Sequence, residues 1–324
     1  MSGRRRFVLG ALAAAVAPFA SGQAEGRVVR IGILRPTAPS TADFPYTIPA
    51  ALRDLGYVEG RNVAFEHAYA DGSVERLPAL ARELVAKQVD VVVTVGSGAT
   101  LAAKQATATI PIVMFGNFDP IAQGIVPSLS RPGGNVTGVL IAADGTLAGK
   151  RLELLKEAVP RASRIALLVP DDPGVRQQVR EVEQAAARLA VAVPVIEVRG
   201  GDYDRAFRAV VGERPQGLFV AATTFFVRDR RQVIARAAQH RLPAVYEWPE
   251  QVEDGGLMAY GASLSGLYRR VAAYVDRIVK GSPPGELPVE QPTKYELVVN
   301  AATAQAIGLA LPQGLLLRAD RVIR

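Results

Sequence analysis

Apolar runs of strand length alternate with amphipathic helical stretches from Arg27 to the end of the chain. The run at 89–96 is almost entirely apolar, which is typical of a parallel strand covered by helices on both faces. Further strands are predicted at 28–34, 62–69, 110–116 and 135–141, and helices at 46–55, 75–87 and 97–107. This alternation predicts parallel sheets with right-handed crossover connections.

The alternation restarts near residue 147, which predicts a second lobe rather than one very large sheet. Its helices are predicted at 147–158, 175–189, 203–213 and 228–240, and its strands at 164–170, 192–198, 217–222 and 242–248. A strand at 256–261, a helix at 264–279 and a strand and helix within 296–309 remain, and we expect them to return to the first and then the second lobe.

The predicted fold class is therefore α/β, with two doubly wound parallel-sheet lobes joined by a three-crossing hinge. We expect residues 28–142 plus 257–283 to form the N-terminal lobe, and residues 143–256 plus 284–324 to form the C-terminal lobe. Glycine and proline clusters predict the crossings at 131–134, 254–256 and 281–285.

The first 24 residues have the pattern of an export signal. Arg4 to Arg6 are followed by an apolar stretch over 7–20 and by the small residues Gly22 and Ala24. The stretch is short for a membrane span, although a basic N-terminal anchor is an alternative. We expect a periplasmic protein. The Arg-Arg-x-Phe arrangement also suits the twin-arginine route, but a Sec signal can begin in the same way.

Composition narrows the possible chemistry. The chain has no cysteine and two histidines, His67 and His240, so we expect no disulfide, no metal site and no cysteine nucleophile. Removal of residues 1–24, with three arginines and no acid, lowers the formal net charge from +7 to +4. No basic run of five occurs, so we expect no nucleic-acid partner. G-x-S-x-G and P-loop motifs are absent, and we expect no enzyme and no cofactor.

Ligands of open parallel sheets bind beyond the carboxyl ends of the strands, so the loops at those ends are the candidate site. The loop from Gly96 through Ser97 and Gly98 to Thr100 follows the most apolar strand and opens a helix, which makes it a candidate anion cradle. Ser97 could instead cap its own helix. The loop nearly matches a dinucleotide fingerprint, but Leu101 stands at the final position, so NAD is not expected.

The other strand ends supply further candidates. We expect ligand contacts from Arg35, Asn117, Asp119, Asp171, Thr223, Phe225 and Glu247. Asp119 precedes Pro120 and could equally cap a helix, and Phe225 could simply pack beneath its loop. The loops at 170–173, 223–226 and 246–248 are equivalent positions in the second lobe.

Long ungapped segments resemble a known family. They lie at 51–63, 76–85, 101–113, 119–138, 149–160, 239–248, 255–281 and 287–309. These segments resemble ABC transporter substrate-binding proteins of the tryptophan/tyrosine type, over almost the whole chain after residue 24.

The resemblance implies the type I periplasmic binding fold. It implies a monomer that captures a small molecule in the cleft between its lobes, in some relatives an aromatic amino acid, and delivers it to an ABC permease in the inner membrane. Ser97 matches a Ser/Thr that can bind ligand, Asp119-Pro120 matches an Asp-Pro loop, and Tyr260-Gly261 matches a Tyr-Gly pair near the hinge.

One segment departs from the family pattern. Relatives have a phenylalanine-rich helix start and a Gly-Leu-Arg step, whereas this chain has Pro39 to Pro49 and then Ala51. Because this segment borders the cleft, we expect the ligand to differ from that of better-known relatives. An exported ligand sensor of the same fold, docked on a membrane receptor, would use the same clamp, so the sequence leaves transport and sensing open.

Overall fold

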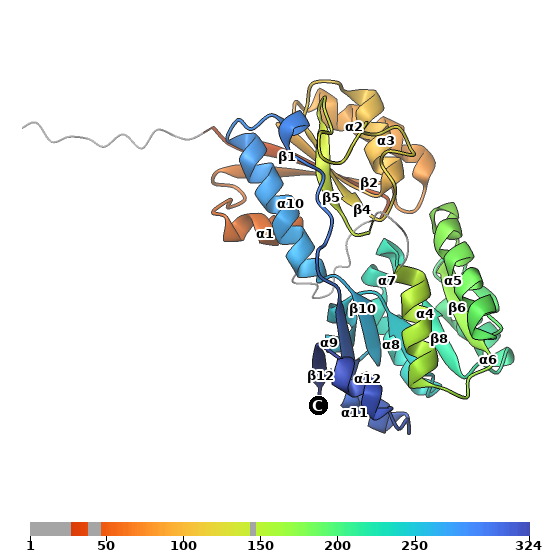
Figure 1. The fold of residues 1–324 in the computed structure, drawn as a ribbon. Coiled ribbons are helices and arrows are strands. Elements are labelled where there is room, and N and C mark those ends of the chain that lie inside the picture. Colours follow the sequence, from red (N-terminus) through yellow and green to blue (C-terminus); the bar gives the residue numbers. More distant parts are fainter. Residues whose placement is uncertain (1–26, 38–46, 143–146) are drawn as a thin grey trace, which may run out of the picture.

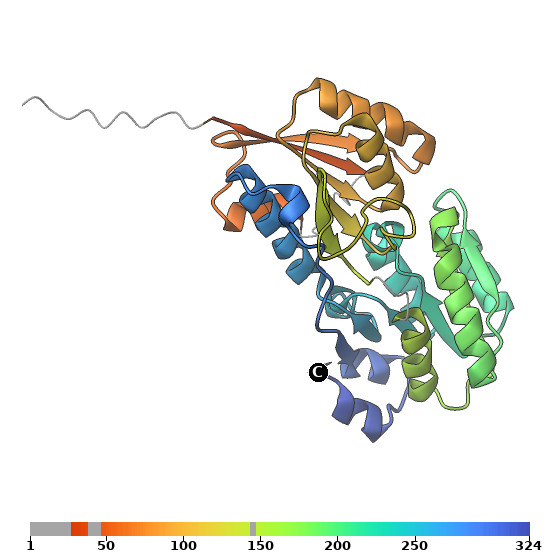
Figure 2. The same cartoon turned by 45° about the horizontal axis from the view of Figure 1, so that its top comes forward.

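The computed structural model describes residues 27–37, 47–142 and 147–324, which form two α/β lobes (Figures 1 and 2). The predicted export signal and most of the Pro39–Pro49 segment lie outside the described residues. Within the described part of the chain, no helix is both long enough and apolar enough to cross a bilayer. The expected fold class, two lobes with parallel sheets, is confirmed.

The first lobe contains a five-stranded parallel sheet in the order β2-β1-β3-β4-β5. Its strands are β1 (Val29–Arg35), β2 (Val63–Tyr69), β3 (Val91–Val95), β4 (Ile112–Gly116) and β5 (Val136–Leu140). Every residue of β3, β4 and β5 is buried, because helices cover both faces of the sheet.

Alternate strand residues enter two separate cores. Ile31, Ile33 and Val93 pack with α1 (Ile48–Asp54) and α10 (Leu264–Val279) on one face. Leu34 and Val92 pack with α2 (Leu77–Ala86) and α3 (Ser97–Ala106) on the other. The side-chain alternation of a strand thus divides the apolar residues between the two layers of helices.

The second lobe contains seven strands in the order β12-β11-β10-β9-β8-β6-β7. They are β6 (Ile165–Pro170), β7 (Val195–Val198), β8 (Gly217–Val220), β9 (Ala244–Tyr246), β10 (Met258–Gly261), β11 (Glu296–Asn300) and β12 (Arg321–Ile323). The strands from β7 to β10 run parallel, and β11 is antiparallel to β10.

Helices of the second lobe surround this sheet. α4 (Leu147–Ala158) contacts α5 (Arg176–Leu189) and lies against β8, β9 and β10, while α6 (Tyr203–Gly212) contacts α8 (Arg230–Gln239). The short helices are α7 (Thr224–Arg228), α9 (Pro249–Glu253), α11 (Ala301–Ala306) and α12 (Gln313–Arg318).

Two predicted lobe boundaries are wrong. Residues 257–283 were expected to return together to the first lobe, and residues 284–324 to belong to the second. Instead, β10 pairs with β9 and β11 in the second sheet, whereas α10 and the segment after it as far as Glu290 lie with the first lobe (Figure 1). The reason is that β10 continues the series of parallel strands from β9, whereas the apolar face of α10 matches the first sheet.

The chain crosses between the lobes three times, as predicted, but at other positions. It crosses between β5 and α4, between β10 and α10, and between Glu290 and β11, since Glu290 still bridges to Val139 in the first sheet. Gly133 and Gly285 instead meet within the first lobe, where the Gly133 N–H donates to the Gly285 carbonyl at 3.1 Å. At 254–256, Gly255 has a φ of +102° and serves a turn that follows α9.

The second crossing is held by a carboxylate. Glu250 of α9 accepts hydrogen bonds from the Ser265 N–H at 3.0 Å and from the Ser263 hydroxyl at 3.2 Å, at the start of α10. Glu250 is 6% exposed. A second-lobe side chain therefore binds the N-terminus of a first-lobe helix, where a negative charge is favourable.

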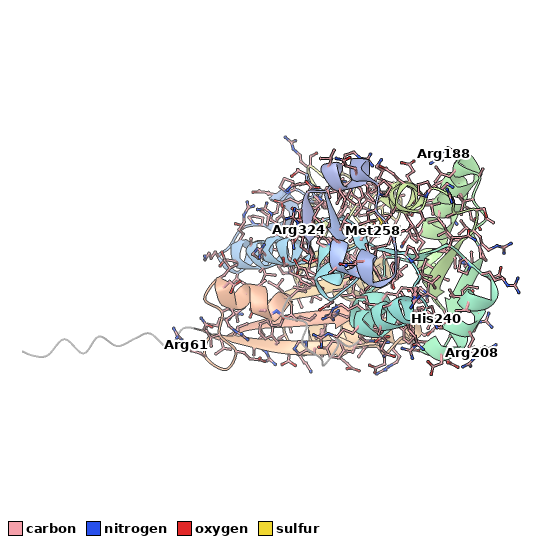
Figure 3. The ribbon with its side chains drawn as sticks, turned by 90° about the horizontal axis from the view of Figure 1, so that it is seen from below. Arg61, Arg188, Arg208, His240, Met258 and Arg324 are labelled. Atoms are coloured by element: carbon pink, nitrogen blue, oxygen red, sulfur yellow. The ribbon has the colours of Figure 1, made fainter. Side chains whose placement is uncertain are left out.

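The two histidines lie in different lobes. His67 is in β2 and stacks on Tyr69 with ring centroids 5.4 Å apart, and His240 follows α8 and stacks on Phe207. In the view of Figure 3, His240 and Arg208 lie at one end of the molecule and Arg61 at the other.

Candidate functional site

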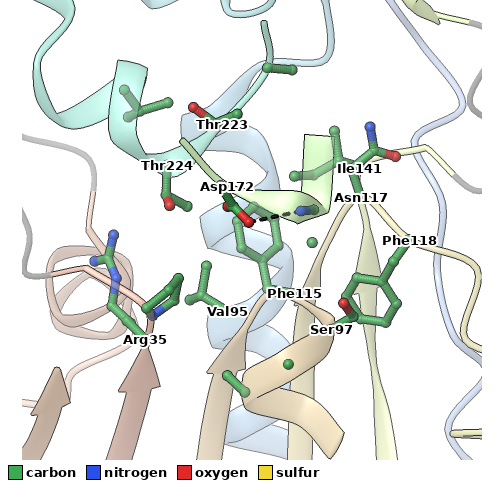
Figure 4. A pocket seen from close by; sticks show the side chains of 18 of the residues that line it. Arg35, Val95, Ser97, Phe115, Asn117, Phe118, Ile141, Asp172, Thr223 and Thr224 are labelled. Atoms are coloured by element: carbon green, nitrogen blue, oxygen red, sulfur yellow. Dashed lines mark hydrogen bonds between the residues drawn. The ribbon is translucent and has the colours of Figure 1, made fainter. Parts of the chain in front are cut away.

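A cavity of about 220 Å³ lies between the lobes, at the carboxyl ends of strands from both sheets (Figure 4). The first lobe contributes residues that follow β1, β3 and β4, and the second contributes residues that follow β6, β8 and β9. Leu264 and Tyr268 of α10 also line it. This is the edge at which parallel sheets bind ligands, so the cavity is the candidate site.

The loop between β3 and α3 brings Ser97 to the cavity. Gly96 has a φ of +87°, which favours glycine, and it occupies the N-cap position of α3. Glycine has no side chain to accept the first N–H groups of the helix. The Ser97 hydroxyl forms no hydrogen bond with another described residue, so it remains available beside the positive end of α3.

Arg35, at the end of β1, reaches the cavity from the first lobe (Figure 4). Its Nε is buried without a hydrogen-bond partner, and no carboxylate of the described residues forms an ion pair with it. A partly buried cation without a counterion is unfavourable, and an anionic group on a ligand would remove that cost.

The second lobe places polar groups opposite. The Asp172 carboxylate accepts the Gly174 N–H at 2.8 Å, which fixes its position (dashed line in Figure 4). The Gln178 amide is held by Ala222, accepting from its N–H at 2.7 Å and donating to its carbonyl at 3.0 Å. Thr223 accepts the Phe226 N–H at 3.2 Å and so caps α7.

Aromatic side chains form much of the remaining wall. The rings of Phe115 and Tyr268 pack with centroids 5.2 Å apart. Trp248 is 4% exposed, and its indole N–H has no hydrogen-bond partner among the described residues. Phe118, Val95 and Ile141 also line the cavity. Such a wall suits a large flat apolar group, with the indole N–H as a spare donor.

Glu247, which follows β9, is 2% exposed and lines the same cavity. Its Oε1 lies 3.5 Å from Nη1 of Arg151, which is fully buried on α4. Burial raises the pKa of the Glu247 carboxyl to about 6, although the positive charge of Arg151 opposes this rise. Burial likewise lowers the pKa of Arg151.

The structure brings six of the predicted residues together. Arg35, Ser97, Gly98, Asn117, Thr223 and Glu247 all line the cavity. This grouping joins the ends of β1, β3, β4, β8 and β9, which are far apart in the sequence. The rule that ligands bind at the carboxyl ends of parallel strands accounts for it.

Five predicted residues lie away from the cavity. The Thr100 side chain is buried and bonded to Thr94 and to the Gly96 carbonyl. Asp119 is exposed and accepts the N–H groups of Ile121 and Ala122, which is the capping alternative. Asp171 is exposed, and Asp172 lines the cavity in its place.

The two remaining predictions concern aromatic residues. Phe225 lies in an outer groove beside Arg228 of its own helix, whose guanidinium is 5.8 Å from the ring centroid. Tyr260 packs on Tyr295 with ring centroids 6.1 Å apart, in a groove beside α4 and α5. Gly261, its neighbour, packs against the backbone of Glu247, because a Cβ there would lie 2.1 Å from the Glu247 carbonyl oxygen, but it does not line the cavity.

Several lining residues were not among the predicted ones: Phe115, Asp172, Gln178, Trp248 and Tyr268. Asp172 and Trp248 belong to strand-end loops that the sequence did single out. Gln178 and Tyr268 lie inside helices, and Phe115 lies inside β4, so the strand-end rule carries no signal for them.

Comparison with known proteins gives a consistent family match. Residues 37–323 match the sequence profile of the family described as ABC transporter substrate binding protein. A tyrosine-binding protein of Clostridioides difficile is 25% identical over 261 residues, which span 80% of this chain and 74% of that protein.

Two solved structures resemble the whole fold. A conserved domain protein from Vibrio cholerae has a TM-score of 0.77 at 24% identity, covering 91% of this chain and 100% of its own. An ABC domain from Streptococcus pneumoniae in complex with L-Trp has a TM-score of 0.75 at 24% identity, with the same coverage.

Proposed function

Since the chain belongs to the family of ABC transporter substrate-binding proteins, we propose that its ligand is an α-amino acid with a large aromatic side chain. The protein captures a small molecule between its lobes for an ABC importer. The observation that carries the amino-acid assignment is the cavity itself, which combines an aromatic wall with a guanidinium on one lobe and carboxylates on the other.

Charge favours a zwitterion. Arg35 on the first lobe, with Ser97 and the N-terminus of α3 beside it, suits a carboxylate. Asp172 and Glu247 on the second lobe suit an ammonium group. A ligand that carries both groups contacts both lobes at once. Binding therefore stabilises the closed arrangement of the clamp.

The aromatic residues favour a large side chain on that amino acid. Phe115, Trp248 and Tyr268 offer ring faces and edges, and the unbonded Trp248 indole N–H could donate to a polar ring substituent. The similar proteins agree in kind, since one is named for tyrosine and another was solved with L-Trp. Their identities to this chain are low, so we propose the class rather than one amino acid.

We further propose that residues 1–24 direct export to the periplasm and that the protein delivers its ligand as a monomer without chemical change. The support is the signal pattern together with the family's extracytoplasmic role. A fusion of residues 1–26 to a reporter should carry it to the periplasm. Retention of the reporter in the cytoplasm would contradict the export proposal.

Calorimetric titration of the purified protein with L-tryptophan, L-tyrosine and L-phenylalanine tests the ligand class. At least one should bind, and Arg35→Met should weaken that binding by about 30-fold or more, because the ligand carboxylate loses its buried cation. Arg30→Met is the matched control, since Arg30 lies on the same strand and pairs with Glu66 at the surface at 3.0 Å. Equal effects of the two substitutions, or no binding of any of the three, would contradict the assignment.

A further inference from the structure

Arg151 and Glu247 form an ion pair in which both side chains are almost completely buried. Arg151 comes from α4 and Glu247 from the end of β9, with Nη1 and Oε1 3.5 Å apart. The Arg151 Nε and Nη1 and the Glu247 Oε1 make no hydrogen bond within the described residues. Pairs of this kind add little stability over apolar residues of similar size, so stability alone does not explain it.

Arg151 lies directly behind the ligand cavity. Glu247 and Gln178 line the cavity, while Arg151 contacts both of them from the protein side, with its Nη2 3.5 Å from Gln178 Oε1. Its guanidinium also lies over the Phe219 ring, 5.3 Å from the centroid. One fixed cation therefore organises two polar groups of the second-lobe wall.

We propose that Arg151 is a positioning residue that holds Glu247 as an anion at the cavity wall, and that this pair makes an ammonium group on the ligand a requirement for tight binding. The inference rests on the proposed amino-acid ligand and adds the residue pair that selects for its amine. An anion inside a largely apolar wall is unfavourable unless a cation faces it, so a ligand without an amine leaves Glu247 incompletely compensated.

The charged and titratable groups around Glu247 come from several elements. Arg151 of α4 acts on Glu247 directly, and Glu181 of α5 acts on Arg151. Asp172 after β6, Arg35 of β1 and Tyr268 of α10 share the cavity with Glu247, and Glu250 of α9 acts on Tyr268. Arg151 is the cation nearest to the Glu247 carboxyl in this group. Removal of Arg151 should therefore raise the pKa of Glu247 further and leave the carboxyl neutral at pH 7.

The experiment compares L-tryptophan with indolepropionate, which has the same ring and carboxylate but no ammonium group. Calorimetry on the wild-type protein at pH 7.5 should give a clear preference for tryptophan, by about 10- to 100-fold. Glu247→Gln should reduce this ratio by about tenfold or more, mainly by weakening tryptophan binding. Lys150→Met is the matched control, since Lys150 is the neighbour of Arg151 on α4 and pairs with Glu153 at the surface.

Arg151→Met gives the readout that separates positioning from general damage. The Arg151→Met variant should show no preference for tryptophan at pH 7, where its Glu247 carboxyl is neutral. The preference should recover as the pH rises toward 9, because Glu247 then ionises even without the neighbouring cation. In the wild-type protein the preference should decline only below about pH 6, where Glu247 takes up a proton. If Arg151→Met folds poorly, the double variant Arg151→Met/Glu247→Gln takes its place, because it removes both charges of the pair. We expect the double variant to fold and to show a low ratio of tryptophan affinity to indolepropionate affinity at every pH.

The outcomes are distinct. If the wild-type protein binds none of L-tryptophan, L-tyrosine and L-phenylalanine, the proposed amino-acid function fails and this inference fails with it. If tryptophan binds but Glu247→Gln and the double variant keep the wild-type ratio, the function stands and the selective role of the pair is refuted. If Glu247→Gln lowers the ratio while Arg151→Met keeps both the ratio and its pH profile, Arg151 does not position Glu247.

Discussion

Replacing Glu247 by Gln should change how the stability of the ligand-free protein depends on pH. The Glu247 carboxyl is buried, and its pKa is raised from 4.5 to about 6 in the folded protein. Between these two values the folded state holds a proton that the unfolded chain has released. The free energy of unfolding of the wild-type protein should therefore fall as pH rises through this window.

The size of the effect follows from the shift. A difference of about 1.5 pH units corresponds to about 2 kcal/mol, at 1.36 kcal/mol per unit. This stabilisation is fully present below pH 4.5 and is lost once the pH passes about 6. The Gln side chain has nearly the same shape and does not titrate. The free energy of unfolding of Glu247→Gln should therefore not fall in this window, although it can differ from the wild-type value by a constant amount.

Urea denaturation at intervals from pH 4 to pH 8 measures the difference directly. The free energy of unfolding of Glu247→Gln, relative to that of the wild-type protein, should increase by about 2 kcal/mol between pH 4.5 and pH 7. Glu66→Gln provides a control of opposite sign, because hydrogen bonds from Lys87 and Arg30 lower the pKa of Glu66. Parallel curves for wild type and Glu247→Gln would refute the argument that burial dominates at this carboxyl.

Three further outcomes are expected. Ser97→Ala should weaken tryptophan binding by about 10- to 100-fold. Its melting temperature should not change, since Gly96 rather than Ser97 holds the N-cap position of α3. A lowered melting temperature with unchanged affinity would mean that Ser97 stabilises the fold and does not bind the ligand. Gly261→Ala should lower both stability and affinity, because the added Cβ would lie 2.1 Å from the Glu247 carbonyl oxygen. Gly212→Ala, where nothing lies within 4 Å of the added Cβ, should lower neither. Small-angle scattering should show a smaller radius of gyration with saturating ligand, and an identical profile would argue against hinge closure.

Much of the fold could be predicted because parallel strands are buried on both faces and read as apolar runs. β3 and β6, for example, are buried at every residue and stand out in the sequence. The hinge could not be located in the same way. Gly133, Gly255 and Gly281 have positive φ values and serve turns within a lobe, so they resemble linkers only in composition.

The site was predictable to the level of the loop but not of the side chain. The sequence indicates that two adjacent carboxylates follow β6, but only the Asx turn made by Asp172 with the Gly174 N–H decides which of them faces the cavity. Tyr268 reaches the site from α10. The return of this helix to the first lobe was predicted, but which of its side chains faces the cavity depends on how it packs against the first sheet. No local pattern encodes such a long-range contact, so pattern reasoning could not supply it.

The position of α10 also has a consequence for the order in which the protein can fold during synthesis. The last strand of the first sheet ends at Leu140, yet the helix that covers one of its apolar faces begins only at Leu264. At about 5–20 residues per second, a ribosome needs on the order of ten seconds to make the segment between them. Throughout that interval Ile31, Ile33 and Val93 lack a large part of their packing partners. The first lobe therefore cannot bury that face until α10 has been made, and a chain that stops before α10 should expose the face to aggregation.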